Sequence, residues 1–161
     1  MAIKIRKATY NDMPDVLELI KELAHFEREP DAVEVTVKEL QADGFATNPA
    51  FFCLVAEKNN QIQGMALMYM RYSTWKGKVL HLEDLIVKND ARGAGIGTRL
   101  FDAVVKYGSK LGVKRISWVV LDWNHTAIEF YKKKGARVLD DWAVVQLDER
   151  GIKNYIDNLS Q

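Results

Sequence analysis

The first quarter of the chain changes from a strand pattern to a helical pattern. Residues 3–8 alternate apolar and basic side chains, which predicts a short strand. From Pro14 to His25, apolar side chains recur at intervals of three and four residues, as in a helix with one buried stripe. Asn11 and Asp12 precede this stretch, and both residue types favour the N-cap position. The sequence therefore predicts a strand that leads into a helix.

A second, shorter helix is predicted by the capping-box spacing of Thr36 and Glu39, and it should end at Gly44. The stretch from Glu27 to Glu34 lies between the two helices. It is acidic and contains a proline, so we expect an exposed loop there.

The centre of the chain carries a strand pattern. Phe51–Glu57 and Ile62–Tyr72 are rich in β-branched, aromatic and other apolar residues. The Asn59-Asn60 pair between them tolerates positive φ, so an antiparallel hairpin is predicted. Val79–Val87 predicts a further strand.

The second half of the chain alternates helices and strands. Its predicted elements are a helix that follows a glycine-rich loop and runs to about Leu111, a strand over Arg115–Leu121, a helix over His125–Lys134, a strand over Trp142–Leu147 and a short helix over Ile152–Leu159. This order predicts an α/β fold, a mixed sheet with helices on both faces. No linker or repeat divides the chain, so we expect residues 1–161 to form a single domain.

Composition and charge exclude several classes of partner. The 161 residues include 23 basic and 22 acidic side chains, so the net charge of +1 gives no basic field for nucleic acid. No apolar run approaches the roughly 20 residues that span a membrane, and the N-terminus lacks a signal-peptide core, so a cytoplasmic protein is expected. One cysteine, Cys53, and three histidines without ligand spacing predict neither a disulfide nor a metal site.

The most informative segment is the glycine-rich loop Arg92-Gly93-Ala94-Gly95-Ile96-Gly97-Thr98, which follows a strand and opens a helix. Glycines at alternate positions let successive N–H groups converge on an anion, and the helix adds its positive end. The loop therefore predicts a pyrophosphate site, with Arg92 as a fixed cation. The simpler interpretation is a tight strand-to-helix connection.

Two other phosphate-binding motifs fit this loop less well. Thr98 stands where the dinucleotide fingerprint, counted from Gly93, requires a glycine, and no Gly-Lys-Ser/Thr ending marks a P-loop. Asp122 loosely resembles the ribose-binding acid of a dinucleotide site. A nucleotide-dependent oxidoreductase therefore stays as an alternative.

At these residues the chain resembles the GNAT superfamily of N-acetyltransferases. Arg92-x-x-Gly95-x-Gly97 matches the family's acetyl-CoA pyrophosphate motif, and Asn124 with residues 130–136 resembles a later family motif. Within the superfamily, the chain is most similar to the spermidine/spermine (diamine) and thialysine acetyltransferase group. The segments that carry this likeness are residues 19–24 with Glu27, 43–45, 53–57, Trp75-x-Gly77-Lys78, Leu82-Glu83-Asp84 and Trp123-Asn124.

The resemblance implies a splayed sheet with acetyl-CoA in the gap. The pantetheine arm would lie against the backbone of Leu85, Ile86 and Val87, and the pyrophosphate on Gly93, Ala94, Gly95, Ile96, Gly97 and Thr98 beside Arg92. Asn124, Thr126 and Ala127 would border the far arm of the cofactor. Family members also form homodimers, often with exchange of late strands, so Trp142–Leu147 would complete a partner's sheet.

Acetyl transfer to an amine needs a proton acceptor and a proton donor. An alkylammonium has a pKa near about 10, so it must lose a proton before it attacks a thioester. The resemblance implies that Glu83 accepts this proton, directly or through water, and a bulge would bring Asp84 to the same cleft. From the pattern alone, both carboxylates could equally face solvent. Tyr131 is the expected acid for the leaving thiolate, although a tyrosine on a helix more often only packs its ring.

The resemblance also implies a site for a small cationic amine, formed by Phe26, Glu27, Trp75, Glu83 and Asp84. Phe26 replaces a tyrosine of the polyamine enzymes, and Ser73 replaces an aspartate. A lost acidic anchor weakens binding of a distant second ammonium group, so a shorter diamine, a thialysine-like amine or another small primary amine stays open.

These observations predict an acetyl-CoA-dependent N-acetyltransferase. The alternatives are a module that senses acetyl-CoA without turnover, and the oxidoreductase. The presence of both Glu83 and Tyr131 disfavours the sensor.

Overall fold

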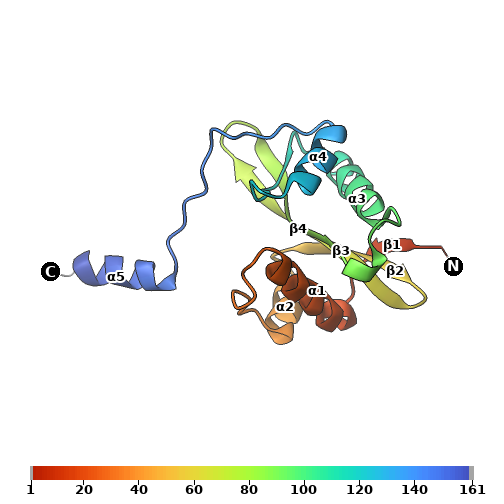
Figure 1. Ribbon diagram of the computed structural model, residues 1–161. Coiled ribbons are helices and arrows are strands. Elements are labelled where there is room, and N and C mark those ends of the chain that lie inside the picture. Colours follow the sequence, from red (N-terminus) through yellow and green to blue (C-terminus); the bar gives the residue numbers. More distant parts are fainter. Residues whose placement is uncertain (1, 160–161) are drawn as a thin grey trace. The chain divides into compact units, whose positions relative to one another are not determined.

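The computed structural model describes residues 2–159 and has an α/β fold (Figure 1). Its contacts divide the chain into two compact units, one up to Val119 and one from Val120 onward. Among the described residues, the first unit contains the sheet and three α-helices, and the second contains two α-helices.

The sheet is mixed, as the order of elements predicts. Its strands follow the chain: β1 (Lys4–Lys7), β2 (Phe52–Lys58), β3 (Gln61–Ser73), β4 (Gly77–Val87) and β5 (Ile116–Ser117). The pairs from β1 to β4 are antiparallel, and β4 pairs with β5 in parallel. The predicted β2–β3 hairpin is confirmed, because Asn59 and Asn60 adopt φ angles of 54° and 59° at its turn.

The sheet is splayed between β4 and β5. These strands pair only at Leu80 with Ile116 and at His81 with Ser117, whereas β4 continues to Val87. The prediction of a strand over Arg115–Leu121 is therefore wrong in its extent. Beyond Ser117 the chain leaves the edge of β4, and apolar side chains that would pack on a sheet, such as Val119 at 66% exposure, face solvent.

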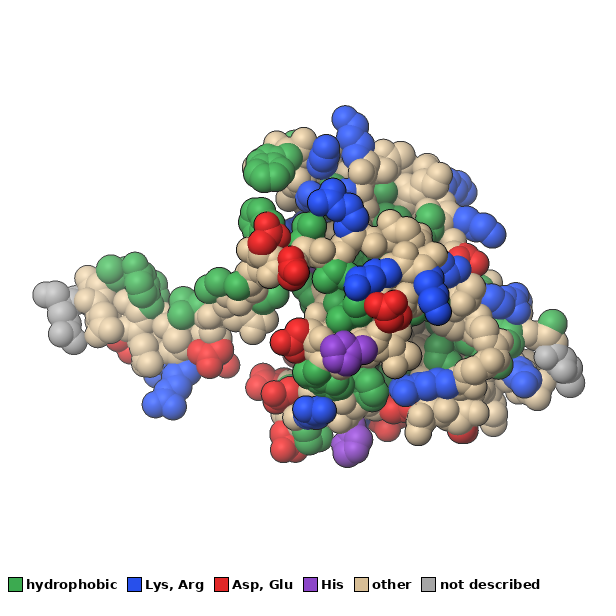
Figure 2. Space-filling model, turned by 45° about the horizontal axis from the view of Figure 1, so that its top comes forward, with side chains coloured by type: hydrophobic (Ala, Val, Ile, Leu, Met, Phe, Trp, Pro, Cys, Tyr) green, Lys and Arg blue, Asp and Glu red, His purple; other side chains and the backbone are tan. Residues whose placement is uncertain are grey.

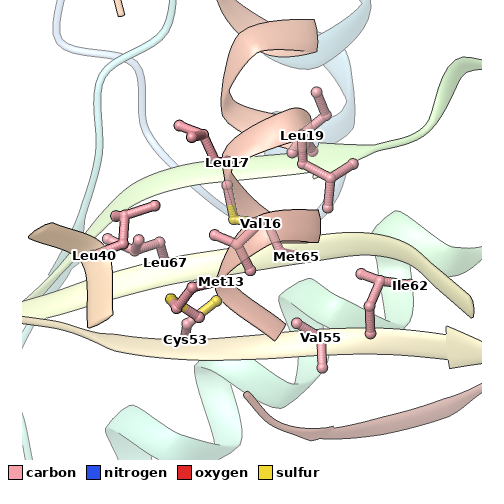
Figure 3. Packing of buried hydrophobic residues seen from close by; sticks show 11 residues of the cluster. Met13, Val16, Leu17, Leu19, Leu40, Cys53, Val55, Ile62, Met65 and Leu67 are labelled. Atoms are coloured by element: carbon pink, nitrogen blue, oxygen red, sulfur yellow. The ribbon is translucent and has the colours of Figure 1, made fainter. Parts of the chain in front are cut away.

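Helices cover both faces of the sheet, as expected (Figure 1). α1 (Met13–Phe26) and α2 (Val37–Gly44) lie on one face, and α3 (Ile96–Lys110) lies on the other. Figure 3 shows the core under α1, where Met13, Val16 and Leu19 pack against apolar side chains of β2 and β3. The predicted capping box of α2 is confirmed, because the Glu39 N–H donates to the Thr36 side chain.

The start of α1 departs from the prediction in one detail. Asp12 occupies the N-cap position, but its side chain makes no cap hydrogen bond. Its carboxylate instead accepts from Thr9 N and from both terminal nitrogens of Arg6, at 2.6 to 2.9 Å. Arg6 also donates to Glu57 on β2 at 2.7 Å. The Asp12 carboxylate therefore links the start of α1 to Arg6 of β1 and does not cap the helix.

The second unit contains α4 (His125–Lys133) and α5 (Glu149–Leu159), which is longer than predicted. The predicted strand over Trp142–Leu147 is wrong for this chain, because these residues are extended without strand pairing. Their apolar side chains are exposed, with Val145 at 89%. Figure 2 shows hydrophobic side chains at the surface of this C-terminal segment. None of the helices within residues 2–159 is long and apolar enough to cross a membrane.

Candidate functional site

A β-bulge in β4 brings two consecutive carboxylates to one face of the sheet. Leu67 of β3 pairs with Asp84 and the next residue, Met68, pairs with Leu82, so Glu83 is the extra residue. Paired residues share a face, which places Asp84 on the side of Leu67, under α1. The Glu83 carboxylate lies on that face too, since its Oε2 is 3.5 Å from Nε2 of His81, whose pairing partner is Tyr69.

Glu27 adds a third negative charge beside this bulge. It directly follows α1, and its charge together with that of Glu83 acts on Asp84. Burial, reinforced by these two charges, raises the pKa of Asp84 to about 6. Burial also raises the pKa of Glu27. We call Glu27, Glu83 and Asp84 the acidic cluster, and a positively charged group would relieve its internal repulsion.

The glycine-rich loop leads from β4 into α3. Gly93 and Gly95 have φ angles of 81° and 74°, where side chains are strained, and Gly95 is the N-cap of α3. Gly97 lies within the first turn of α3, and a Cβ there would meet Val87 at an ordinary 3.7 Å. Only two of the three glycines therefore need their conformational freedom. First-turn N–H groups lack intrahelical acceptors, so the exposed loop presents donors to an anion.

The C-terminal half of α1 holds this loop from one side. The Arg92 Nε donates to the Val87 carbonyl at 3.1 Å, and its guanidinium lies over the Phe26 ring at 5.4 Å. Glu22 accepts from the Asn89 N–H at 2.8 Å, just before the loop. Sequence reasoning assigned no role to Glu22, and its position on the helix gives no signal of this contact.

The second unit carries Asn124, Thr126, Ala127 and Tyr131 on or beside α4. Asn124 is the N-cap of α4, and its Oδ1 accepts from Ala127 N at 3.2 Å. Tyr131 is half-buried next to Phe130, with ring centres 5.3 Å apart. Burial raises the pKa of its phenol to about 12, so the hydroxyl stays protonated at neutral pH.

Trp75 lies apart from the acidic cluster of its own chain. It stands in the β3–β4 turn, is 77% exposed, and its backbone N–H donates to Ser73 Oγ at 3.2 Å. At about 3.3 Å per strand residue, the turn is roughly 20 Å from Asp84 along β4. Within the first unit, the structure thus gathers Phe26, Glu27, Glu83, Asp84 and the glycine-rich loop, whereas Trp75 of the same unit lies apart from them.

The profile of the acetyltransferase (GNAT) family matches residues 13–136. The chain belongs to this family. It is 38% identical over 148 residues to thialysine N-epsilon-acetyltransferase of Sus scrofa, which covers 87% of each chain. It is 39% identical over 140 residues to the human spermidine/spermine N(1)-acetyltransferase-like protein 1, covering 83% of this chain and 20% of the human one.

Solved structures agree on the fold. An integron cassette protein from the mobile metagenome of V. cholerae superposes with a TM-score of 0.80 at 20% identity, over 97% of this chain and 98% of that one. The family and its relatives identify the chain as an N-acetyltransferase. The resemblance read from the sequence is therefore confirmed, and the sensor and oxidoreductase alternatives are set aside.

Proposed function

We propose that this enzyme transfers acetyl directly from acetyl-CoA to a primary amine of a small cationic substrate. The observation that carries the proposal is the acidic cluster, three carboxylates gathered at a bulge beside an anion-binding loop. The whole chain, residues 1–161, would act as one acetyltransferase domain, because the family profile over residues 13–136 continues across the division between the two units.

The glycine-rich loop fits the pyrophosphate of acetyl-CoA, which supplies the acetyl group as a reactive thioester. Two glycines with positive φ and the first turn of α3 provide backbone donors without obstructing side chains. Arg92 is held by its Nε and by Phe26, which leaves its terminal nitrogens to face phosphate oxygens. The backbone of residues 85–87, at the splayed edge of β4, would bind the pantetheine arm.

The acidic cluster suits both tasks on the amine side. Glu27 and Asp84 attract the ammonium group, and its positive charge offsets their mutual repulsion. Glu83 has the most accessible carboxylate at the bulge, with 53% of its side chain exposed, so a proton can reach it directly or through water. Loss of this proton frees the nitrogen lone pair for attack on the thioester.

Tyr131 is the proposed acid for the departing thiolate. Its raised pKa keeps the proton on the phenol until a base of similar strength forms nearby. Burial raises the pKa of thiols as well, and it raises that of Cys53 to about 12. A thiolate released from CoA in a desolvated site would therefore be a suitable acceptor for the phenol proton.

The substrate class is a diamine, a polyamine or a thialysine-like amine. The relatives named above act on thialysine, or are named after spermidine and spermine. Ser73 stands where the polyamine enzymes have an acidic anchor, and here its hydroxyl binds turn backbone instead. We therefore favour the shorter amines.

We also propose that the enzyme is a homodimer. Residues 142–147 carry a strand pattern, and their apolar side chains are exposed. Both features suit a strand that pairs with the sheet of a second copy. Trp75 is too far from its own acidic cluster to touch the same small amine, so its role in binding requires a second copy. Light scattering coupled to size exclusion should give twice the 18.4 kDa chain mass.

A panel of amines tests the proposed function. Acetyl-CoA is mixed with propane-1,3-diamine, spermidine, thialysine, lysine or an aminoglycoside, and free thiol is measured. We expect thiol release only when an amine is present, fastest with thialysine or the diamine. Binding of CoA without thiol release from any of these amines would contradict the proposal.

A further inference from the structure

His81 lies next to the proposed proton acceptor and has no role in the chemistry described so far. It is buried, with 8% exposure, and its ring lies 5.1 Å from that of Tyr69. Its Nε2 faces Glu83 Oε2 at 3.5 Å, and its Nδ1 faces Ser117 Oγ at 3.3 Å. The imidazole thus joins a hydroxyl on β5 to the bulged carboxylate on β4.

The chemistry of the neighbours fixes which nitrogen carries the proton. Burial lowers the pKa of His81; the Glu83 charge opposes this shift and the Arg71 charge adds to it. A neutral imidazole has one N–H and one lone pair, and an ionised carboxylate can only accept. Nε2 therefore carries the proton toward Glu83, and Nδ1 accepts from the Ser117 hydroxyl, which can serve as donor.

We propose that His81, oriented by Ser117, is a positioning residue that aims the Glu83 carboxylate at the incoming amine. The inference rests on the proposed function, in which Glu83 removes the ammonium proton. Glu83 needs such support because it is the unpaired residue of a bulge and 53% of its side chain is exposed, so packing alone does not fix where its carboxylate points. The 3.5 Å between Nε2 and Oε2 is longer than a formed hydrogen bond, and catalytic contacts in a free enzyme often shorten when substrate binds.

The first test is spectroscopic and does not depend on turnover. In protein labelled with ¹⁵N-histidine, long-range proton–nitrogen correlation distinguishes the two neutral tautomers and the imidazolium. We expect His81 to be the Nε2–H tautomer at pH 7, and a His81→Gln variant to identify its signals. An Nδ1–H tautomer at pH 7 would overturn the inference, because Nε2 would then have no proton to donate, whereas an imidazolium keeps the Nε2 proton and would agree with it.

The second test is kinetic, with acetyl-CoA and thialysine. His81→Phe keeps the ring against Tyr69 but removes the donor, so we expect kcat to fall about tenfold, the size of one hydrogen bond to a charged group. The KM for acetyl-CoA should stay near the wild-type value, because the contact lies at the proposed amine site. His81→Gln keeps an N–H and should recover most of kcat. Ser117→Ala should lower kcat by less than His81→Phe does.

Two controls separate this role from a structural one. Lys78→Gln, an exposed change on the same strand, should leave kcat unaltered. In a Glu83→Gln background, His81→Phe should cause no further loss, since the carboxylate it serves is gone. Equal losses in both backgrounds, or no recovery of kcat by His81→Gln, would overturn the inference. Failure of the proposed function itself has another signature, namely full activity of Glu83→Gln or no thiol release by the wild type.

Discussion

The guanidinium carbon of Arg92 lies 5.4 Å from the centre of the Phe26 ring. Phe26 immediately precedes Glu27 of the acidic cluster. This contact joins the end of α1 to the start of the glycine-rich loop. The helix that carries part of the proposed amine site therefore also supports the cation proposed to bind the pyrophosphate.

Replacing Phe26 by leucine should weaken binding of acetyl-CoA. An exposed cation–π contact is worth about 0.5–1 kcal/mol, so the acetyl-CoA Kd should rise about two- to fivefold. Phe26→Tyr keeps the ring and should bind acetyl-CoA as the wild type does. Phe45 is exposed to 40%, against 39% for Phe26, so Phe45→Leu is a matched control that should not change Kd. Calorimetric titration measures all four proteins, and equal effects of the two leucine variants would contradict the assigned contact.

Replacing Asp84 by asparagine should raise the stability of the protein and weaken its binding of the amine. The folded-state pKa of Asp84, about 6, lies above the usual 3.8, so this carboxyl lowers stability as pH rises from about 4 to about 6. At pH 7, Asp84→Asn should therefore raise the unfolding free energy, by at most about 3 kcal/mol, and the gain should vanish near pH 3. The KM for thialysine should rise about tenfold, since one charge-assisted contact is lost.

Denaturant unfolding at the two pH values, beside the exposed control Asp157→Asn, measures the stability part of this prediction. Destabilisation by Asp84→Asn at pH 7 would show that the carboxylate is stabilised in place rather than strained by its neighbours.

Asp12 should have the opposite pH signature. Hydrogen bonds from Arg6, and secondarily from Thr9, lower its pKa to about 2 against a usual 3.8. It therefore stabilises the fold above about pH 4, and this contribution is lost as pH falls to about 2. Asp12→Asn should reduce the unfolding free energy at pH 7 by about 2 kcal/mol, with the gap to wild type closing across that interval. Urea titrations from pH 7 to pH 2 measure the gap, and a constant difference at every pH would refute the ion-pair explanation.

Tyr131→Phe removes the proposed proton donor without changing the ring. Loss of general acid catalysis should lower kcat about a hundredfold, while the Kd for CoA stays near the wild-type value. Phe130→Leu, at the neighbouring position, is a packing control. It should lower the stability of the protein, so its effect is not confined to kcat. Unchanged turnover of Tyr131→Phe would remove this residue from the mechanism.

Most of the secondary structure could be predicted from short local sequence motifs. The Asn59-Asn60 turn and the Thr36/Glu39 capping box predicted their elements because the residues involved also make the defining contacts. The bulge at Glu83 could not be placed from the pattern, since alternation does not show which residue lacks a partner. Residues 142–147 show the reverse failure, because a strand pattern becomes a strand only where a partner edge is available.

The candidate site, too, could be predicted from the sequence only where it depends on local motifs. The glycine-rich loop is local, so it was recognised, although Gly97 proved to be an ordinary helix residue. The contacts of His81 with Ser117 and of Glu22 with Asn89 join residues distant in sequence, and no spacing rule predicts them.

Direct transfer of acetyl to a bound amine is tested most simply by a mass balance. Purified enzyme is mixed with acetyl-CoA alone and then with acetyl-CoA and thialysine, and free thiol, N-acetylated amine and the mass of the intact protein are followed together. We predict no thiol release and an unmodified protein without amine, and equal amounts of thiol and acetylated amine once thialysine is added. Thiol release without amine, accompanied by an acetylated protein, would contradict direct transfer at the acidic cluster.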